Sequence, residues 1–218
     1  MIQIKTSVDK KAITLMPNVS FQGRIVVVLS ESECDKAVAY LNTQKVVGLD
    51  TETRPSFAKG KTYKVSLIQI STEEICFLFR LNYIGFPDSL THFLENGQIL
   101  KIGLSLRDDF NAMHKRTDFA PQGFVELQKY MKEFGVTDMS LQKIYALLFG
   151  EKISKNQRLT NWEADVLSDK QKQYASIDAW ACLRIYRYVE ERKKAQDYEL
   201  IYPVPVPLVR TIELNEES

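Results

Sequence analysis

Two carboxylates lie two residues apart at Asp50-Thr51-Glu52, directly after the apolar run 46–49. In an extended chain such positions project to the same side, so both carboxylates face one way. Carboxylates crowded into a partly buried site repel each other and lose hydration unless a cation or a basic partner compensates. The pair therefore indicates a metal site, although a lone Asp-x-Glu is more often a solvated turn at the end of a strand.

A second acid lies on a predicted helix near the C-terminal end of the chain. Tyr174, Asp178, Ala181, Ile185 and Tyr188 recur at alternating steps of four and three residues. This spacing places Asp178 in an apolar stripe, with Tyr174 one turn away on the same face. An ionised side chain is seldom buried there unless it is paired or bound to metal. The alternative is an exposed stripe edge, where Asp178 meets a Lys or Arg.

A third acidic pair, Asp108-Asp109, falls on the helix expected after the strand 99–103. Taken alone, acids in the first turn of a helix usually interact with the helix dipole. The pair indicates a functional site only in combination with the other two acidic segments, between which it lies in chain order.

Strands and helices are predicted from apolar periodicity and from capping residues. The helices are expected to run from Ser32 to about residue 42, from Asp88 through Leu94, from about Ser105 to Lys115, from Ser140 to Leu148 before Gly150, and from about Asp169 to Lys194 after the cap Ser168. The strands are expected at 25–29, 46–49, 65–70, 75–79 and 99–103 and near Val125, and residues 151–167 are expected to be irregular.

This order predicts one α/β domain. Three antiparallel strands followed by strand-helix alternation give a mixed sheet of five to six strands flanked by helices, as in ribonuclease-H-like nucleases. We expect an N-terminal arm at 1–22, the domain at 23–195, and a C-terminal tail at 196–218. Alternating prolines at 203, 205 and 207 favour polyproline geometry in that tail.

The composition is that of an ordinary soluble globular protein, with 44% hydrophobic and 26% charged residues. No apolar run approaches the roughly 20 residues of a membrane helix. The N-terminus lacks a secretory signal pattern, and Cys34, Cys76 and Cys182 are expected to be reduced core thiols, so a cytoplasmic location is expected. Because the net charge is only +1, any phosphate-binding surface must come from local clustering.

The three acidic segments together, in this order, resemble the Tyr-containing branch of the DEDD 3′-5′ exonucleases, and most closely the Werner-type and ribonuclease-D-type domains. The resemblance extends from about Gly23 to Val189. It includes the segments 47–52, 64–70, 101–103 leading to Asp109, 124–127, 140–141, 161–162 and 167–179. Thr53 stands where the Werner-type domain has an aromatic residue.

This resemblance implies a 3′-5′ exonuclease that acts on single-stranded 3′ ends of DNA or RNA by a two-metal mechanism. Asp50, Glu52, Asp109 and Asp178 would hold two Mg²⁺ or Mn²⁺ ions, and Tyr174 would position the attacking water. Counting from Lys101-Ile102-Gly103 selects Asp109, and a slip of one residue would select Asp108. His92 and His114 form no cluster that would indicate zinc.

Thr51, Lys64 and Arg158 are the candidates for contacts with nucleic acid. They belong to two groups that also include the nearby cations Lys59, Lys61, Lys152 and Lys155. Each of these cations alone is more often a solvated surface residue.

Two other functions remain open from the sequence. The chain could be a non-catalytic nucleic-acid-binding or scaffolding module that keeps the fold, because a fold does not secure a function. It could also be an endonuclease or a processing RNase of the same fold. The sequence does not discriminate DNA from RNA, because local pocket geometry senses the 2′-hydroxyl.

Overall fold

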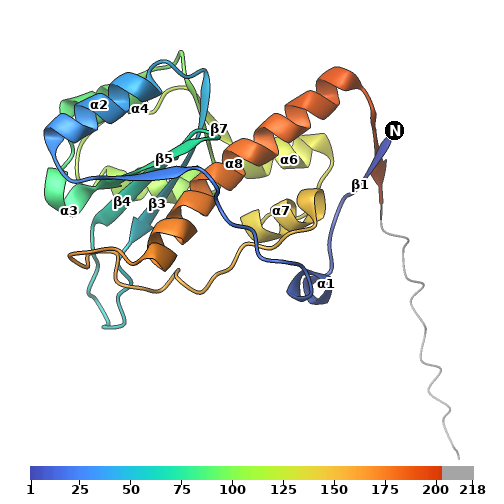
Figure 1. The fold of residues 1–218 in the computed structure, drawn as a ribbon, viewed down its shortest axis with the longest axis horizontal. Coiled ribbons are helices and arrows are strands. Elements are labelled where there is room, and N and C mark those ends of the chain that lie inside the picture. Colours follow the sequence, from blue (N-terminus) through green and yellow to red (C-terminus); the bar gives the residue numbers. More distant parts are fainter. Residues whose placement is uncertain (203–218) are drawn as a thin grey trace, which may run out of the picture.

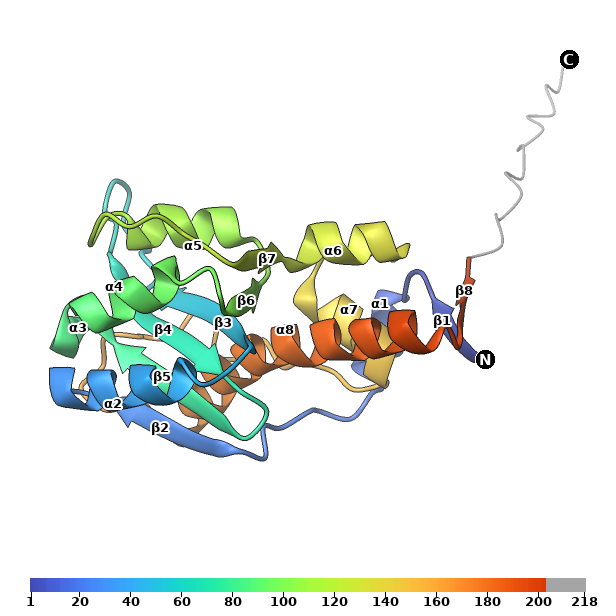
Figure 2. The same ribbon diagram turned by 90° about the horizontal axis from the view of Figure 1, so that it is seen from above.

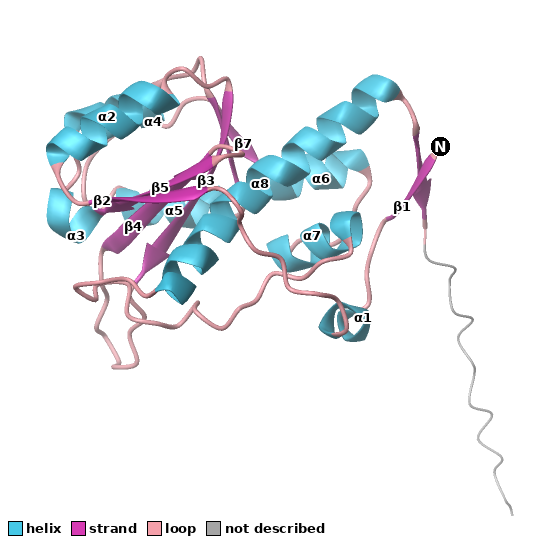
Figure 3. Ribbon diagram, in the orientation of Figure 1, coloured by secondary structure: helices cyan, strands magenta, loops and turns pink. Residues whose placement is uncertain are grey.

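A six-stranded mixed sheet forms the centre of the protein, in a computed structural model that describes residues 1–202 (Figures 1 and 3). Strands β3, β4 and β5 are antiparallel, β6 and β7 continue parallel to β3, and β2 lies parallel to β5 at the other edge. The predicted fold class is confirmed. In the order β2-β5-β4-β3-β6-β7, the strands are Arg24–Val28, Ile75–Arg80, Val65–Ser71, Val46–Thr53, Leu100–Gly103 and Phe124–Glu126.

Strand β3 is longer than predicted. The prediction ended it at residue 49, but the strand continues to Thr53, because Asp50 to Glu52 pair with β4 opposite Gln69 to Leu67. The register shifts only between Glu52 and Thr53. The two acids therefore belong to the sheet itself, which fixes their backbone positions.

Helices cover both faces of the sheet (Figure 2). Alternate β3 residues face opposite layers. Val47 and Leu49 pack in the hydrophobic cluster on the side of α2, α4 and α5. Leu67 of β4, which lies opposite Glu52, packs in the cluster on the side of α8. The first layer contains α2 (Glu31–Leu41), α3 (Leu81–Ile84), α4 (Asp88–Glu95) and α5 (Leu106–Met113), and the second contains α6 (Leu127–Phe134), α7 (Leu141–Phe149) and α8 (Asp169–Ala195).

Helix α8 crosses β3 at very close range. A Cβ at Gly48 would lie 1.8 Å from the carbonyl oxygen of Ala179, so only glycine permits this approach. Ala179 follows Asp178 in the chain. The contact therefore brings Asp178 to the β3 residues that follow Gly48.

The predicted cap of α8 at Ser168 and the predicted end of α7 at Gly150 are confirmed. The Ser140 and Ser168 side chains accept hydrogen bonds from backbone N–H groups in the first helical turns, and Gly150 ends α7 in the left-handed conformation. The start predicted for α2 was wrong: the helix is capped by Ser30 with Glu33 in a capping box, not by Ser32. Helices α3 and α6 were not predicted.

The segment 1–22, predicted as an N-terminal arm, has secondary structure of its own. It contains β1 (Ile2–Lys5), which pairs in parallel with β8 (Tyr198–Ile201), and the short helix α1 (Lys10–Thr14). Tertiary hydrogen bonds, rather than local periodicity, hold it in place. The predicted polyproline stretch lies outside the described residues.

The three cysteines are free and buried, as predicted. Within residues 1–202, none of the helices combines the length and apolarity needed to cross a bilayer.

Candidate active site

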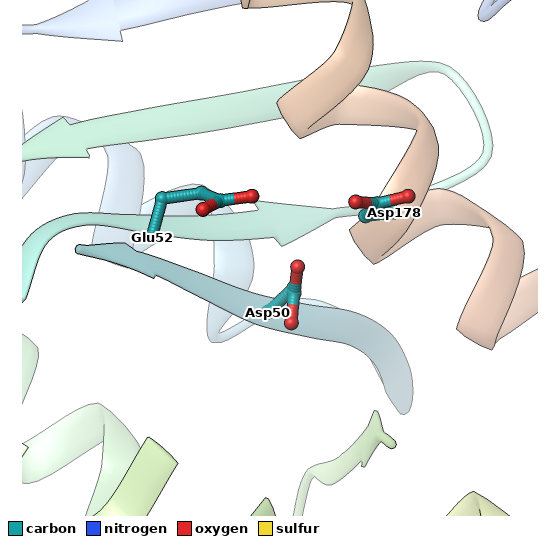
Figure 4. A group of neighbouring side chains, drawn as sticks. All are labelled: Asp50, Glu52 and Asp178. Carbon is teal, nitrogen blue, oxygen red and sulfur yellow. The ribbon is translucent and has the colours of Figure 1, made fainter. Parts of the chain in front are cut away.

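Three carboxylates from two elements converge at the surface between β3 and α8 (Figure 4). Asp50 and Glu52 project from β3 toward α8, and Asp178 projects from α8 toward them. One oxygen of each residue lies within 4.8 Å of the others. The structure thus brings together three of the four acids that the sequence predicted as metal ligands.

These carboxylates destabilise one another in their ionised forms. Burial, followed by the charges of Asp109, Asp178 and Glu52, raises the pKa of Asp50 well above its usual value. Burial raises the pKa of Glu52 to about 9 and that of Asp178 to about 7, and the Tyr174 hydroxyl lowers the latter by a smaller amount. A bound cation would reverse this effect by stabilising the ionised forms.

The fourth acid, Asp109, lies in the layer on the opposite side of β3. Thr51 points away from Asp50 and Glu52, and its hydroxyl donates a hydrogen bond to the Asp109 carboxylate on α5. Burial raises the pKa of Asp109 to about 6. Asp109 is not within the 4.8 Å group, but its charge has the largest electrostatic effect on Asp50.

The choice between Asp108 and Asp109 follows from their exposure. Asp109 is 9% exposed and bonded to Thr51, whereas Asp108 is exposed at the surface of α5. Asp109 is therefore the one of the two that is directed toward β3.

Glu126, which the sequence analysis did not predict, fixes the start of α5. Its carboxylate accepts hydrogen bonds from the backbone N–H groups of Ser105 at 3.0 Å and Leu106 at 2.8 Å. Ser105 has a φ of 64°, which a non-glycine residue adopts only when its surroundings hold it there. Glu126 thus positions the helix that carries Asp109. Its sequence signals were its place after a β-branched residue in a short strand and its position in the segment 124–127, which carries part of the family resemblance.

Tyr174 lies one helical turn before Asp178, with its ring packed at 6.0 Å from that of Trp162. Burial, followed by the charges of Asp178 and Glu52, raises the pKa of its phenol. The hydroxyl therefore stays protonated at neutral pH. It can donate a hydrogen bond, but it cannot serve as a general base.

A cavity of about 490 Å³ opens beside the acids and is lined by Asp50, Tyr174 and Asp178. Lys155 and Arg158 line its other side, from the predicted irregular segment. The charge of Arg158 lowers the pKa of Glu52, and that of Lys155 lowers the pKa of Asp178. The cavity therefore combines carboxylates that could hold a cation with cationic side chains suited to a phosphate.

The other predicted nucleic-acid contacts lie elsewhere. Lys64 is exposed before β4 and does not line this cavity, and Lys61 lines a separate one of about 330 Å³ with Arg54 and Tyr63. Thr51 is directed to Asp109 instead of the cavity.

The donor atoms of this cluster are carboxylate oxygens, which suit Mg²⁺ or Mn²⁺ better than zinc. His114, by contrast, lies away from it, with its ring nitrogen 3.0 Å from the carbonyl oxygen of Phe119. The residues present therefore fit a hard divalent cation.

Both a family model and a known protein that resemble this chain are described as 3′-5′ exonucleases. A family model described as 3′-5′ exonuclease matches residues 25–193. The chain is 31% identical over 182 residues to the mouse bifunctional 3′-5′ exonuclease/ATP-dependent helicase WRN, which covers 79% of this chain but only 13% of that protein.

Solved structures share the fold at lower identity. The EXO domain of Nibbler from Aedes aegypti has a TM-score of 0.75 at 18% identity, covering 83% of this chain and 95% of that domain. Ribonuclease D of Trypanosoma brucei in complex with RNA U12 has a TM-score of 0.67 at 20% identity, covering 78% of this chain and 63% of the other. At these identities, the two structures show that this chain shares their fold.

Proposed function

The chain belongs to the family of 3′-5′ exonuclease domains, and on that premise we propose that it hydrolyses the phosphodiester bond nearest the 3′ end of a nucleic-acid strand. The observation that carries this proposal is the convergence of Asp50, Glu52 and Asp178 within 4.8 Å. A purely structural site would not place three carboxylates against one another without a basic partner of matching charge.

Asp50, Glu52 and Asp178, joined by Asp109, would hold two divalent cations of the Mg²⁺ or Mn²⁺ type. Such ions activate water and stabilise the leaving 3′-oxygen in an in-line displacement. Burial and the charges of the other three acids raise the pKa of Asp50, and a bound cation would stabilise its ionised form.

The other residues of the site position the substrate and the nucleophile. The protonated Tyr174 hydroxyl donates a hydrogen bond that orients the attacking water beside Asp178. Lys155 and Arg158 bind the phosphate next to the scissile bond, while the cavity receives the terminal nucleotide.

The substrate we propose is a single-stranded 3′ end. A strand end can enter a cavity of about 490 Å³ only when its last base is free of a partner strand. The complex of the trypanosomal ribonuclease D with RNA U12 supports the same substrate class here. Both DNA and RNA strands serve as test substrates, because local pocket geometry decides between them.

Strands of DNA and RNA labelled at the 5′ end test the activity in Mg²⁺, Mn²⁺ or EDTA. We expect a ladder that shortens from the 3′ end, disappears in EDTA and is absent with Asp50→Ala. Blocking the 3′-hydroxyl end should slow the ladder, whereas products from internal cleavage would indicate an endonuclease. Strands that bind but stay intact in every metal would indicate the non-catalytic binding module.

A further inference from the structure

A second cavity, of about 600 Å³, adjoins the one beside the acids. The two share Ser140, Gln142, Ile153 and Lys155 in their linings. The far wall of the second cavity comes from the N-terminal segment, through residues of α1 and Asn18. This wall lies outside residues 25–193, which the family model matches.

The charge of this second cavity is one-sided. Among the described residues, four lysines and no acidic residue line it, although the whole chain carries 29 basic and 28 acidic residues. Lys143 is neutralised by Asp138 at 2.7 Å. Within residues 1–202, neither Lys10 nor Lys155 forms an ion pair, and the Lys152 ammonium donates to the carbonyl oxygen of Thr14 at 2.6 Å. The cavity therefore has a net positive charge, because Lys143 alone of its four lysines is in an ion pair within residues 1–202.

The N-terminal wall is held in place by the protein. The Val19 N–H donates to the Lys152 carbonyl at 3.0 Å, and the Lys152 N–H donates to the Pro17 carbonyl at 2.8 Å. The Gln173 side chain forms two hydrogen bonds of 3.1 Å with the Phe21 backbone. Ile13 of α1 is 4% exposed. The cavity is thus preformed and needs no closing segment to bind a ligand.

We propose that this second cavity, together with Lys10, Lys152 and Lys155, is a groove that binds the sugar-phosphate backbone of a single strand on the 5′ side of its terminal nucleotide. This inference rests on the proposed function, because the acids define where the 3′ end lies. With the terminal nucleotide beside Asp50, the preceding nucleotides pass Lys155, which both cavities share, and reach Lys10.

The chemistry of the lining fits a nucleic-acid backbone in any sequence. Lysine ammonium groups bind phosphates as point charges, while the side-chain amides of Asn18, Gln142 and Asn156 can hydrogen-bond sugar and phosphate oxygens. In the part of the chain that the structure describes, no aromatic residue lines this cavity, so bases are not stacked there. The groove therefore contributes affinity and grip on longer strands, without sequence preference.

The test compares Lys10→Glu with Lys11→Glu, a matched control with the same charge change on the same helix. Lys11 is exposed and lies outside the cavity lining. Binding of 5′-fluorescein strands of about 3 and about 12 nucleotides, shorter and longer than the smallest single-strand sites, is measured by anisotropy in EDTA at several salt concentrations. The kcat/KM for both lengths is measured in Mg²⁺.

We expect Lys10→Glu to weaken binding of the longer strand about fivefold. It should also reduce by about 1 the slope of the logarithm of its binding constant against the logarithm of the salt concentration. The shorter strand and the Lys11→Glu variant should remain within about twofold of the wild type. Lys152→Met, which keeps the stem and removes the charge, should repeat the Lys10→Glu result, with folding checked by circular dichroism.

The proposal of a strand-binding groove would be overturned if Lys10→Glu and Lys11→Glu weakened strand binding equally. It would also be overturned if Lys10→Glu weakened binding of both strand lengths equally. If the wild type cuts both strands and Lys10→Glu shows no length-dependent change, the groove fails while the proposed activity stands. If the wild type cuts neither strand but binds the longer one through Lys10, the activity fails while the groove stands.

Discussion

Gln69 lies directly opposite Asp50 across the antiparallel β3–β4 ladder. Residues opposite each other in such a ladder project to the same face with neighbouring Cβ atoms. Gln69 is fully buried, and neither its amide nitrogen nor its amide oxygen has a hydrogen-bond partner among residues 1–202. A buried amide without partners is costly, so this one fits a water or ligand held beside the acids.

Replacing Gln69 by Met should therefore leave the metal-free protein as stable as the wild type, because the change removes unsatisfied polar atoms and keeps the volume. It should raise the Mg²⁺ concentration needed for half-maximal activity about tenfold, because it removes the amide that would hold a water or ligand beside the acids. Ile70→Val, on the opposite face of β4, is the control. An unchanged Mg²⁺ requirement in Gln69→Met would contradict the assignment.

Substitution of the two adjacent acids of α5, Asp108 and Asp109, should have very different effects on kcat. Asp109→Asn should lower kcat about a hundredfold or more, the usual effect of losing one group that stabilises charge in a transition state. Asp108→Asn should stay within about twofold of the wild type, because Asp108 is exposed. Single-turnover kinetics at saturating Mg²⁺ measures both, and a larger loss in Asp108→Asn would reverse the assignment.

Tyr174→Phe removes the hydroxyl and keeps the ring that packs against Trp162. We expect kcat to fall about a hundredfold, because the nucleophile loses its orientation, while the melting temperature and KM change little. Tyr188→Phe, on the same helix, serves as the control. A variant with the wild-type kcat would show that the hydroxyl has no part in positioning water.

The metal-free protein should lose stability as the pH rises. Unfolded carboxyls titrate near pH 4, whereas the folded pKa is about 6 for Asp109, about 7 for Asp178 and about 9 for Glu52. A raised folded pKa means that the folded state holds the proton more tightly. The stabilisation is therefore complete below about pH 4 and is lost as the pH rises through about 6 to 9.

Thermal melts in EDTA between about pH 5 and about pH 9 measure this loss. Mg²⁺ should restore stability at the alkaline end, because it binds the folded site only. Asp178→Asn should raise the metal-free melting temperature at about pH 8 by roughly 2–4 °C, the shift expected for about 1 kcal/mol in a chain of this size. A melting temperature that rises with pH in EDTA would contradict the electrostatic account.

The sheet and the central acids could be predicted because their signals are local. Residues 46–49 form an apolar run, the segments 65–70 and 75–79 have hairpin spacing, and the stripe containing Asp178 repeats at helix spacing. The structure confirms the mixed sheet and places Asp178 beside Asp50. The same local reasoning ended β3 too early, since pairing with β4 overrides the polarity of Asp50 and Glu52.

The supporting residues could not be predicted because their roles depend on partners far along the chain. Glu126 acts on Ser105, 21 residues earlier, and Gln69 gains its meaning only from its register with Asp50. The N-terminal segment shows no periodicity because it is held by Lys152 and Gln173, more than 130 residues away. Long-range hydrogen bonds leave no spacing pattern in the sequence.

The pairing of β1 with β8 also sets the order in which the molecule can be completed. Ile2 pairs with Tyr198 and Lys5 with Ile201, so β1 is synthesised nearly two hundred residues before its partner strand. The sheet and α8 can assemble before that pairing. The wall that contains Lys10 is held by Lys152 and Gln173, so this wall and the cluster of acids can both be complete before β1 and β8 pair.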